Sequence, residues 1–516
     1  MRSLPPTNLE DWQRSAASLW AKYAAPFCAA YILTLIVYSY LFTTIILTSH
    51  TFPNVWVRPY PSNTTLVEGR WFSDIIRQLI GVGGVQAFQM AVAAALQIVN
   101  GFLFASLLRV DNRFYVFLIA AFLSLHPAVL DYYAYTSDHI IFVAGDTLIL
   151  LGVLALDRTA DRKVGVPLAA LCFMLALATY GPKVALIGVL LLIWCVQSAL
   201  QENRNDFRFL AADRFLPAAV SFAAALIAYF LSTKLTATQA SEFRAHVNDL
   251  NAALRQLRAA YSEVFQDFVQ ADYLPELLRM LPAVSVALGA AVLAWRARQR
   301  GWKSALAVVF LTALFPLALQ LSFIINENTW RHAGRILTPQ SYTLLFFLVS
   351  AWALPHSRQI TTAITLIMLY FFVIVGSQET NAAALGNIYD IEKINRIVSR
   401  LEGIIPESDQ KPLPVVVVGG LGLREHRPRL LSYPNTVYTS QFRFETFAPY
   451  RQVEILNFFI GRDVLRYPTQ GEIDAVIATI PGRRPWPASD SVYIQDGVIV
   501  MLLEPYGKGV PVTEPH

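Results

Sequence analysis

The sequence predicts a membrane protein made almost entirely of α-helices, with about eleven transmembrane helices and a small α/β domain at the C-terminal end. Of the 516 residues, 55% are hydrophobic and only 15% are charged, whereas soluble domains carry about 25% charged residues. The mean hydropathy is +0.45. Apolar segments of roughly 17 to 25 residues, which are long enough to cross a bilayer as helices, recur as far as about residue 376.

The individual spans follow from these apolar segments, read in chain order. They are expected at about 25–49, 83–108, 114–124, 139–156, 164–179, 184–200, 215–232, 281–297, 305–325, 339–354 and 360–376. The third is short and is also compatible with a helix broken at His126-Pro127. The three cysteines all fall inside apolar segments, so we expect neither a disulfide framework nor a cysteine metal site. The first 24 residues are polar, and we expect no cleavable signal peptide.

The basic residues predict the orientation of the bundle. One set of connections is short and basic, for example "RVDNR" and "DRTADRK", and cytoplasmic loops carry such an excess of Lys and Arg. We therefore place the N-terminus in the cytoplasm. The other loops, 50–82, 126–138, 233–280 and 326–338, are placed outside, with residues 1–377 forming the transmembrane domain. The net charge of +5 reflects these basic loops and does not indicate a nucleic-acid partner.

Two regions outside the spans have recognisable patterns. Residues 233–280 include an amphipathic helix pattern, "LNAALRQLRAAYSEVF", which we expect to lie along the outer membrane–water boundary. Residues 378–516 are predicted to form an outer α/β domain, with a helix at 387–404, a buried strand at 413–420 and a hairpin around Asp496-Gly497. The glycines after the strand do not form GxGxxG, so we expect no nucleotide site.

Charged residues near residue 140 are the first candidates for chemistry. Asp131, Tyr135 and Asp138 are spaced i, i+4, i+7 and would share one face of a helix. Such charges in a membrane usually face a cavity. A structural interpretation is that Asp138 caps the next helix while Asp131 is solvated. Asp146 lies two turns inside its span and needs a partner or a proton, and pairing with a basic residue is its expected role.

Further candidates lie where the other outer loops meet the membrane. Arginine binds phosphate in a planar, bidentate way, and tryptophan at the boundary suits a sugar, but both equally suit anchoring to lipid headgroups. The "TYGPK" turn could also be no more than a connection between two helices. The candidates are Glu68, Arg70, Trp71, Asp74, His139, Tyr180, Lys183, Arg331, His332 and Arg335.

Taken together, these features resemble the bacterial Gtr type II (O-antigen) glucosyltransferases, which belong to the GT-C class of polyprenyl-phosphate-sugar glycosyltransferases. The resemblance rests on "GRWFSD" at the end of the first outer loop, "HPAVLDYYAYTSD", "TYGPK", the arginine of "GRIL", and the tail with "PVVVVGG" and "DGVIVMLL". It extends over nearly the whole chain and implies a GT-C-like transmembrane domain.

The resemblance implies an enzyme of the bacterial inner membrane that moves a sugar from undecaprenyl phosphate to a cell-envelope glycan, such as the O-antigen of lipopolysaccharide, on the periplasmic side. Such enzymes invert the anomeric centre, with a carboxylate as general base. The family usually has an acidic pair early in the first outer loop, where this chain has Asn54-Val55. We therefore place the base at Asp138, then Asp131, then Glu68, and the phosphate at Arg335 and Arg331, with Arg70 and Lys183 assisting.

The missing acidic pair leaves two alternatives open. The chain could be an inactive relative that binds a lipid-linked sugar or assists assembly, or a proton-coupled transporter or flippase that uses Asp146. The resemblance also implies as partners a flippase and a separate glycosyltransferase that charges the lipid. Some GT-C relatives use a divalent cation, Mg or Mn, but the acid cluster that would hold it is missing from the first loop, so we assign no metal ligands.

Overall fold

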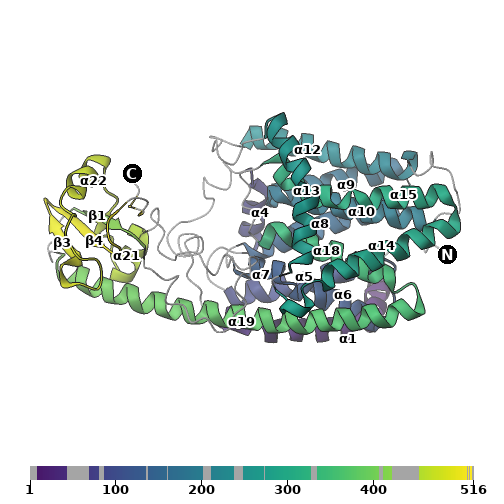
Figure 1. Cartoon of the computed structure of the whole chain (residues 1–516), viewed down its shortest axis with the longest axis horizontal. Coiled ribbons are helices and arrows are strands. Elements are labelled where there is room, and N and C mark those ends of the chain that lie inside the picture. The colour runs from purple at the N-terminus through teal and green to yellow at the C-terminus, as the bar shows by residue number, and fades with distance from the viewer. Residues whose placement is uncertain are drawn as a thin grey trace.

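The structure is a bundle of helices with a small sheet beyond one of its ends (Figure 1). The computed structural model describes residues 9–43, 69–80, 86–134, 138–159, 161–201, 211–236, 248–271, 273–326, 334–405, 411–420, 452–507, 510 and 512–513. Within these ranges nine helices are long and apolar enough to cross a membrane, or ten if a bent pair is counted as one span. The predicted fold class, a polytopic helical membrane protein with a small C-terminal sheet, is confirmed.

The helices that form and surround the bundle follow the chain order closely. They are α1 (Leu9–Val37), α2 (Ser39–Thr43), α4 (Trp71–Ile80), α5 (Gln86–Leu107), α6 (Arg113–Leu125), α7 (Pro127–Ala134), α8 (His139–Arg158), α9 (Arg162–Thr179), the 3₁₀ turn η2 (Gly181–Lys183), α10 (Val184–Gln201), the π-helical turn η3 (Ala211–Phe215), α12 (Leu216–Thr236), α13 (Leu250–Val269), the 3₁₀ turn η4 (Glu276–Leu278), α14 (Leu281–Arg300), α15 (Trp302–Ala313), α16 (Phe315–Leu319), α17 (Leu321–Ile325), α18 (Gly334–Ala351) and α19 (Pro355–Glu402).

The third predicted span is a broken helix. α6 and α7 meet at 61°, and His126 between them has an extended backbone with φ −57° and ψ 131°. The cause is Pro127, because a proline disfavours the helical conformation in the residue before it.

The span predicted at 339–354 is α18, which is not among the nine helices that are apolar enough to cross a membrane. Its first turns carry Arg335 and several polar residues.

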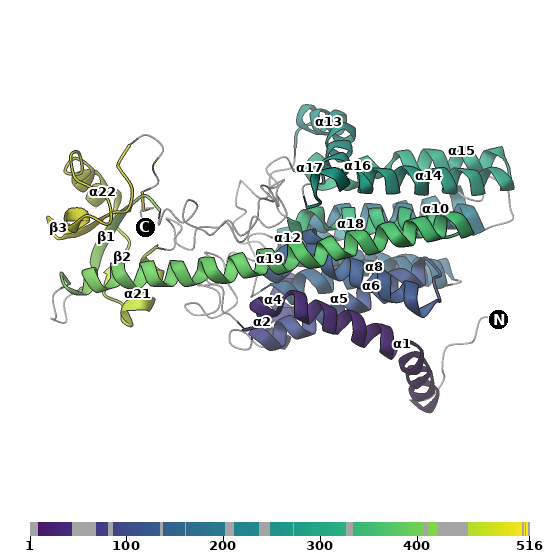
Figure 2. The same cartoon turned by 60° about the horizontal axis from the view of Figure 1, so that its bottom comes forward.

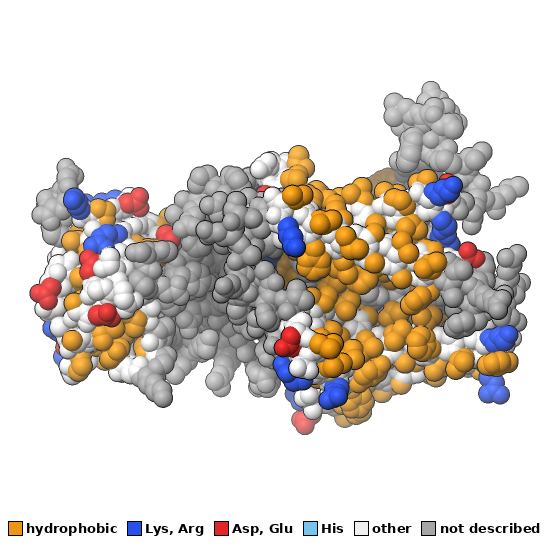
Figure 3. Space-filling model, turned by 90° about the horizontal axis from the view of Figure 1, so that it is seen from above, with side chains coloured by type: hydrophobic (Ala, Val, Ile, Leu, Met, Phe, Trp, Pro, Cys, Tyr) orange, Lys and Arg blue, Asp and Glu red, His pale blue; other side chains and the backbone are white. Residues whose placement is uncertain are grey.

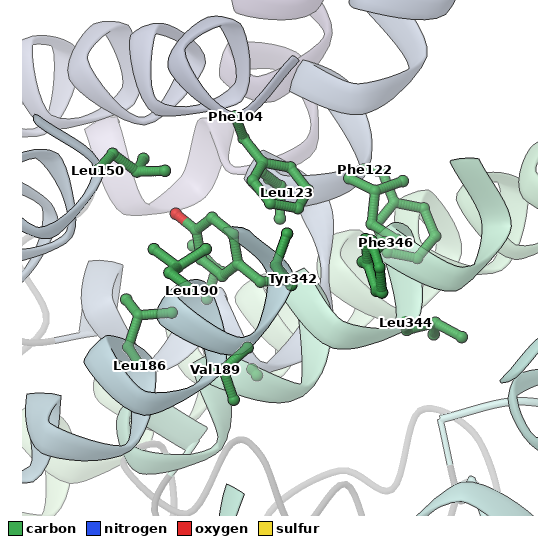
Figure 4. Close-up of a cluster of buried hydrophobic side chains, with 14 of the residues drawn as sticks. Phe104, Phe122, Leu123, Leu150, Leu186, Val189, Leu190, Tyr342, Leu344 and Phe346 are labelled. Atoms are coloured by element: carbon green, nitrogen blue, oxygen red, sulfur yellow. The ribbon is translucent and has the colours of Figure 1, made fainter. Parts of the chain in front are cut away.

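The core of the bundle is formed by apolar side chains from several helices. Figure 4 shows Tyr342 of α18 among Phe104, Leu150 and Leu190, and the ring centroids of Phe104 and Tyr342 are 5.2 Å apart. Lipid is as apolar as this core, so close packing rather than escape from water holds such helices together. A Cβ atom at Gly101 would lie 2.5 Å from Ala120 Cα, so α5 and α6 approach each other only because position 101 is glycine.

The outer surface of the bundle is also apolar, and the lysines and arginines visible in Figure 3 lie toward its ends. Large side chains exposed on it include Ile36, Ile227, Leu231, Leu306, Phe310 and Tyr370, each at least 55% accessible. A contiguous exposed apolar surface of this extent marks contact with a membrane. The surface therefore agrees with helices that face lipid.

The amphipathic helix predicted within 233–280 is α13, which runs across the bundle helices rather than parallel to them (Figure 1). Its exposed face carries an apolar stripe at helical spacing, formed by Leu250, Leu254, Leu257, Tyr261 and Phe265. The Tyr261 hydroxyl donates to the Ala313 carbonyl, 2.9 Å away, at the end of α15. Tyr261 of the stripe thus contacts the end of α15, whose exposed side chains include Leu306 and Phe310, as expected of a helix at the membrane boundary.

This placement predicts different surroundings for two exposed faces of α13. With the three native cysteines replaced by alanine, a fluorophore on Leu257→Cys is expected to be quenched by brominated lipids in nanodiscs. The same fluorophore on Ser262→Cys, an exposed position beside the stripe, is the matched control and should be quenched mainly by aqueous iodide. Equal quenching of both labels by iodide would show that the stripe does not contact lipid.

The C-terminal region is a sheet covered by helices on both faces. Strands β1 (Leu413–Val418), β2 (Leu465–Arg466), β3 (Val492–Gln495) and β4 (Val498–Leu502) lie in the order β2-β1-β4-β3. β1 is parallel to both neighbours, and β3 and β4 form the predicted hairpin at Asp496-Gly497. Both turn residues have positive φ, 50° and 79°, as a type I′ hairpin turn requires.

α19 connects the bundle to this sheet as one continuous helix of 48 residues (Figure 2). Its last turns pack with α21 (Gln452–Ile460) on one face of the sheet, while α22 (Gln470–Ile477) covers the other face. Arg400 fixes the end of α19 by stacking 4.1 Å above the Trp486 ring and donating to the Pro487 and Ala488 carbonyls. The boundary predicted at residue 377 falls inside α19.

Candidate functional site

Charged side chains gather where α4 and α7 lie, at the end of the bundle that faces the C-terminal sheet (Figure 1). Among the described residues, three ion-paired groups are found there, within a set of four carboxylates and four cations. These are Asp74, Asp131, Asp138 and Asp146 with Arg70, Arg77, Lys183 and Arg335. They come from segments up to 265 positions apart in the chain, from Arg70 to Arg335, so the fold assembles the cluster.

The first group joins α4 to the start of α8 through Arg77. Arg77 Nη1 donates to Asp74 Oδ1 at 2.9 Å, and Arg77 Nε donates to Asp138 Oδ1 at 3.1 Å. Arg77 Nη2 also contacts Asp138 Oδ1. The side chain of Asp138 is 12% exposed, while those of Asp74 and Arg77 are 6% and 5% exposed. Asp138 is therefore the member of this group that a substrate reaches most easily.

The second group joins α7 to the start of α18. Asp131 Oδ2 accepts from the backbone N–H of Arg335 at 2.9 Å and from its Nη1 at 3.2 Å. This satisfies one of the N–H groups that the first turn of a helix leaves without a partner. Arg335 Nε donates to the Tyr180 hydroxyl at 2.9 Å. Arg70 contacts the same ring, with its Cζ 4.9 Å from the centroid, so two guanidinium groups meet at Tyr180.

The third group lies inside the bundle and confirms that Asp146 has a basic partner. Lys183 Nζ contacts both Asp146 Oδ1 and the Tyr132 hydroxyl, and its side chain is only 2% exposed. Tyr132 also hydrogen-bonds Thr338 Oγ1 at 2.8 Å, and Thr338 donates to the Arg335 carbonyl at 3.1 Å. This buried group thus supports the turn of α18 that carries Arg335.

Two interpretations based on the sequence near residue 138 are wrong. Asp131 belongs to α7, which ends at Ala134, whereas Asp138 precedes α8 with a non-helical backbone (φ −125°, ψ −4°). The two carboxylates therefore do not share the face of one helix. Asp138 occupies the N-cap position but makes no capping hydrogen bond with its side chain, because Arg77 engages it. Asp131 is not solvated but 0% exposed.

The segment that carries Arg70 is held by α12. The Trp71 indole N–H donates to Ser232 Oγ at 3.0 Å. Gly69 has φ +72°, and a Cβ there would lie 2.9 Å from the Thr233 side chain, so the close approach requires glycine. Trp71 therefore fixes Arg70 relative to α12, in addition to any contact with substrate.

The remaining predicted residues are only partly placed. His139 follows Asp138 directly and is buried. Glu68, Tyr135, Arg331 and His332 lie outside the described residues. In the part of the chain that the structure describes, no three His, Cys, Asp or Glu side chains gather as metal ligands would, and each of the four carboxylates faces Arg or Lys. We therefore derive no step through a metal ion.

Sequence reasoning missed Arg77, which lies at the centre of the first group. A signal for it exists in "WFSDIIRQLI": Ser73, Asp74 and Arg77 are buried on one face of α4, while Ile75 and Leu79 are 42% and 80% exposed. This is an inside-out amphipathic helix, with apolar residues toward lipid and charges toward the protein. Reading 71–80 as a helix would have put Asp74 and Arg77 one turn apart on the same face.

Arg70 lies close enough to Arg77 and to Arg335 for its charge to be repelled by both. Such a concentration of guanidinium groups beside the carboxylate of Asp138 is suited to an anionic ligand, because arginine binds phosphate through paired N–H donors. The arrangement can hold a phosphate and present a base to a neighbouring hydroxyl.

Comparison with known proteins identifies the family to which this bundle belongs. Neither the curated proteins nor the solved structures include a match to the chain. The family model described as Glucosyl transferase GtrII matches residues 56–350, a region that holds all the charged residues of the cluster. Because this match covers more than half of the chain and agrees with the resemblance of the sequence motifs, the protein belongs to the GtrII glucosyl transferase family.

Proposed function

We propose that this protein transfers glucose from undecaprenyl phosphate to a cell-envelope glycan at the membrane face that carries the charged cluster. Membership of the GtrII family indicates a glucosyltransferase, and the apolar helices indicate a membrane protein. The observation that carries the proposal is the meeting of Arg70 and Arg335 at the Tyr180 ring, close to Asp138, whose side chain is 12% exposed.

In the proposed reaction the two arginines hold the phosphate of the lipid-linked donor. The acceptor hydroxyl attacks the anomeric carbon from the side opposite the phosphate, so the configuration inverts. Asp138 accepts the hydroxyl proton, and the bond from the anomeric carbon to the phosphate oxygen breaks with its electron pair on the phosphate. Positive charge at the leaving oxygen lowers the barrier because charge develops there in the transition state.

The distribution of basic residues supports the orientation. Basic residues at the termini of α6, α8 and α14 lie at the end of the bundle away from the cluster; they include Arg113, Arg158, Arg298 and Arg300. By the positive-inside rule this end faces the cytoplasm. The cluster and the C-terminal sheet then lie on the periplasmic side of a bacterial inner membrane. A cytoplasmic enzyme that charges the lipid and a flippase would supply the donor.

A transfer assay tests this function directly. Protein in nanodiscs would be incubated with synthetic polyprenyl-phosphate glucose and extracted envelope glycan, with and without Mg or Mn. Wild type is expected to transfer glucose, and Arg335→Gln to lose about 10²- to 10³-fold in kcat/KM, because a donor to the developing phosphate charge is removed.

The matched control is Arg113→Gln, which removes an exposed arginine at the opposite end of the bundle and should retain activity. Equal activity of Arg335→Gln and wild type would remove the phosphate assignment. Binding of the lipid without transfer to any glycan would favour the inactive relative, and proton-coupled uptake into vesicles would favour a transporter.

A further inference from the structure

Arg77, the arginine at the centre of the first charged group, has a role that rests on the proposed function of Asp138. Among the described residues, both hydrogen bonds to Asp138 fall on one oxygen, Oδ1, which receives Arg77 Nε and Nη2. A guanidinium group usually meets a carboxylate with one N–H to each oxygen. Here both N–H groups meet the same oxygen, so Oδ2 receives neither of them.

Arg77 is itself fixed from its other side. Its Nη1 donates to Asp74 Oδ1 at 2.9 Å, one turn earlier in α4. The side chains of Arg77 and Asp74 are only 5% and 6% exposed, so the pair has little freedom to move. The donors of Arg77 are therefore directed at two carboxylates, whereas Arg70 and Arg335 meet at Tyr180.

We propose that Arg77 is the positioning residue of the general base: it holds Asp138 Oδ1 so that Oδ2 faces the acceptor hydroxyl, and Asp74 holds Arg77. During transfer, Oδ2 takes the proton of the hydroxyl as its oxygen bonds to the anomeric carbon, and the phosphate leaves with the electron pair. Arg77 touches neither the sugar nor the phosphate.

The charges around Asp138 support this role. Burial alone would raise the pKa of Asp138, but the ion pair and hydrogen bonds with Arg77, together with the charges of Arg70 and His139, hold the pKa below the ordinary value of a carboxyl group. Asp74 also faces Arg77 from α4. Asp138 is thus ionised at neutral pH and able to accept a proton. Loss of Arg77 would raise its pKa.

The experiment compares Arg77→Gln with Arg70→Gln in the transfer assay across pH. For Arg77→Gln, we expect kcat to fall about 10²-fold, as misplacement of a catalytic group does, with KM for the donor within about twofold of wild type. Because activity is lost as pH falls through the pKa of the base, and loss of Arg77 raises that pKa, the acid limb of the kcat profile should move to higher pH. Arg70→Gln should instead raise KM for the donor.

A raised donor KM for Arg77→Gln with an unmoved acid limb would show that Arg77 binds phosphate, and would overturn the proposal. If Arg77→Gln does not fold, Arg77→Lys is the second variant, because it keeps the positive charge but lacks the directed N–H donors of a guanidinium group. It should show the fall in kcat with a smaller shift of the acid limb. An unchanged kcat would overturn the proposal. If wild type binds the donor but transfers no sugar, the proposed function itself is wrong. That result differs from an outcome that overturns only the role of Arg77.

Discussion

Replacement of Asp138 by asparagine is expected to reduce glucosyl transfer by about 10³-fold while donor binding remains, because a general base contributes about 10²- to 10⁴-fold. The substitution keeps the shape of the side chain and an oxygen for Arg77, but an amide does not accept the proton of the acceptor hydroxyl. The loss should appear in kcat rather than in KM for the lipid-linked donor. Single-turnover transfer with bound donor measures it most directly.

Two further aspartates make this prediction specific. Asp157→Asn is the matched control, since Asp157 lies at the opposite end of the bundle near Arg109, 3.6 Å away, and this variant should transfer normally. Asp131→Asn should instead weaken donor binding, because Asp131 holds Arg335. If Asp138→Asn and Asp131→Asn both retain full transfer in folded protein, the base lies elsewhere, with Glu68 as the next candidate.

The fold could be predicted from the sequence largely because lipid imposes a simple rule. Every backbone group in the bilayer must be satisfied within its own segment, so long apolar runs become helices. The hairpin at Asp496-Gly497 was equally predictable, since few residue pairs suit two positive φ angles. The end of α7 and the start of α8 were not predictable from the sequence. The apolar pattern around them is continuous, and the positions depend on Pro127 and on the packing of α7 against α18.

The cluster was predictable in its residue types but not in its pairings. Asp131, Asp138 and Arg335 stood out because charge near a span is costly. Nothing in local spacing shows that Arg335 pairs with Asp131, 204 positions away, because such contacts depend on tertiary packing. Lys183 was predicted near the phosphate, yet its ammonium group points to Asp146 and Tyr132.

The buried pair of Lys183 and Asp146 leads to the second large prediction. Removal of one member of a buried ion pair leaves an uncompensated charge and costs about 3 to 5 kcal/mol, while replacing both with apolar residues is often neutral. We therefore expect Lys183→Met and Asp146→Leu each to lower the unfolding temperature strongly. The double variant should recover most of the loss in a double-mutant cycle.

The activity of the double variant separates a structural pair from a proton pathway. Tyr132 should keep its hydrogen bond to Thr338, and Thr338 its bond to the Arg335 carbonyl, so the turn of α18 at the proposed phosphate site should remain in place. Transfer by the double variant is then expected within about tenfold of wild type. A folded double variant without transfer would mean that these two charges take part in the reaction, or in proton movement as a transporter requires, because their structural role alone would have been replaced.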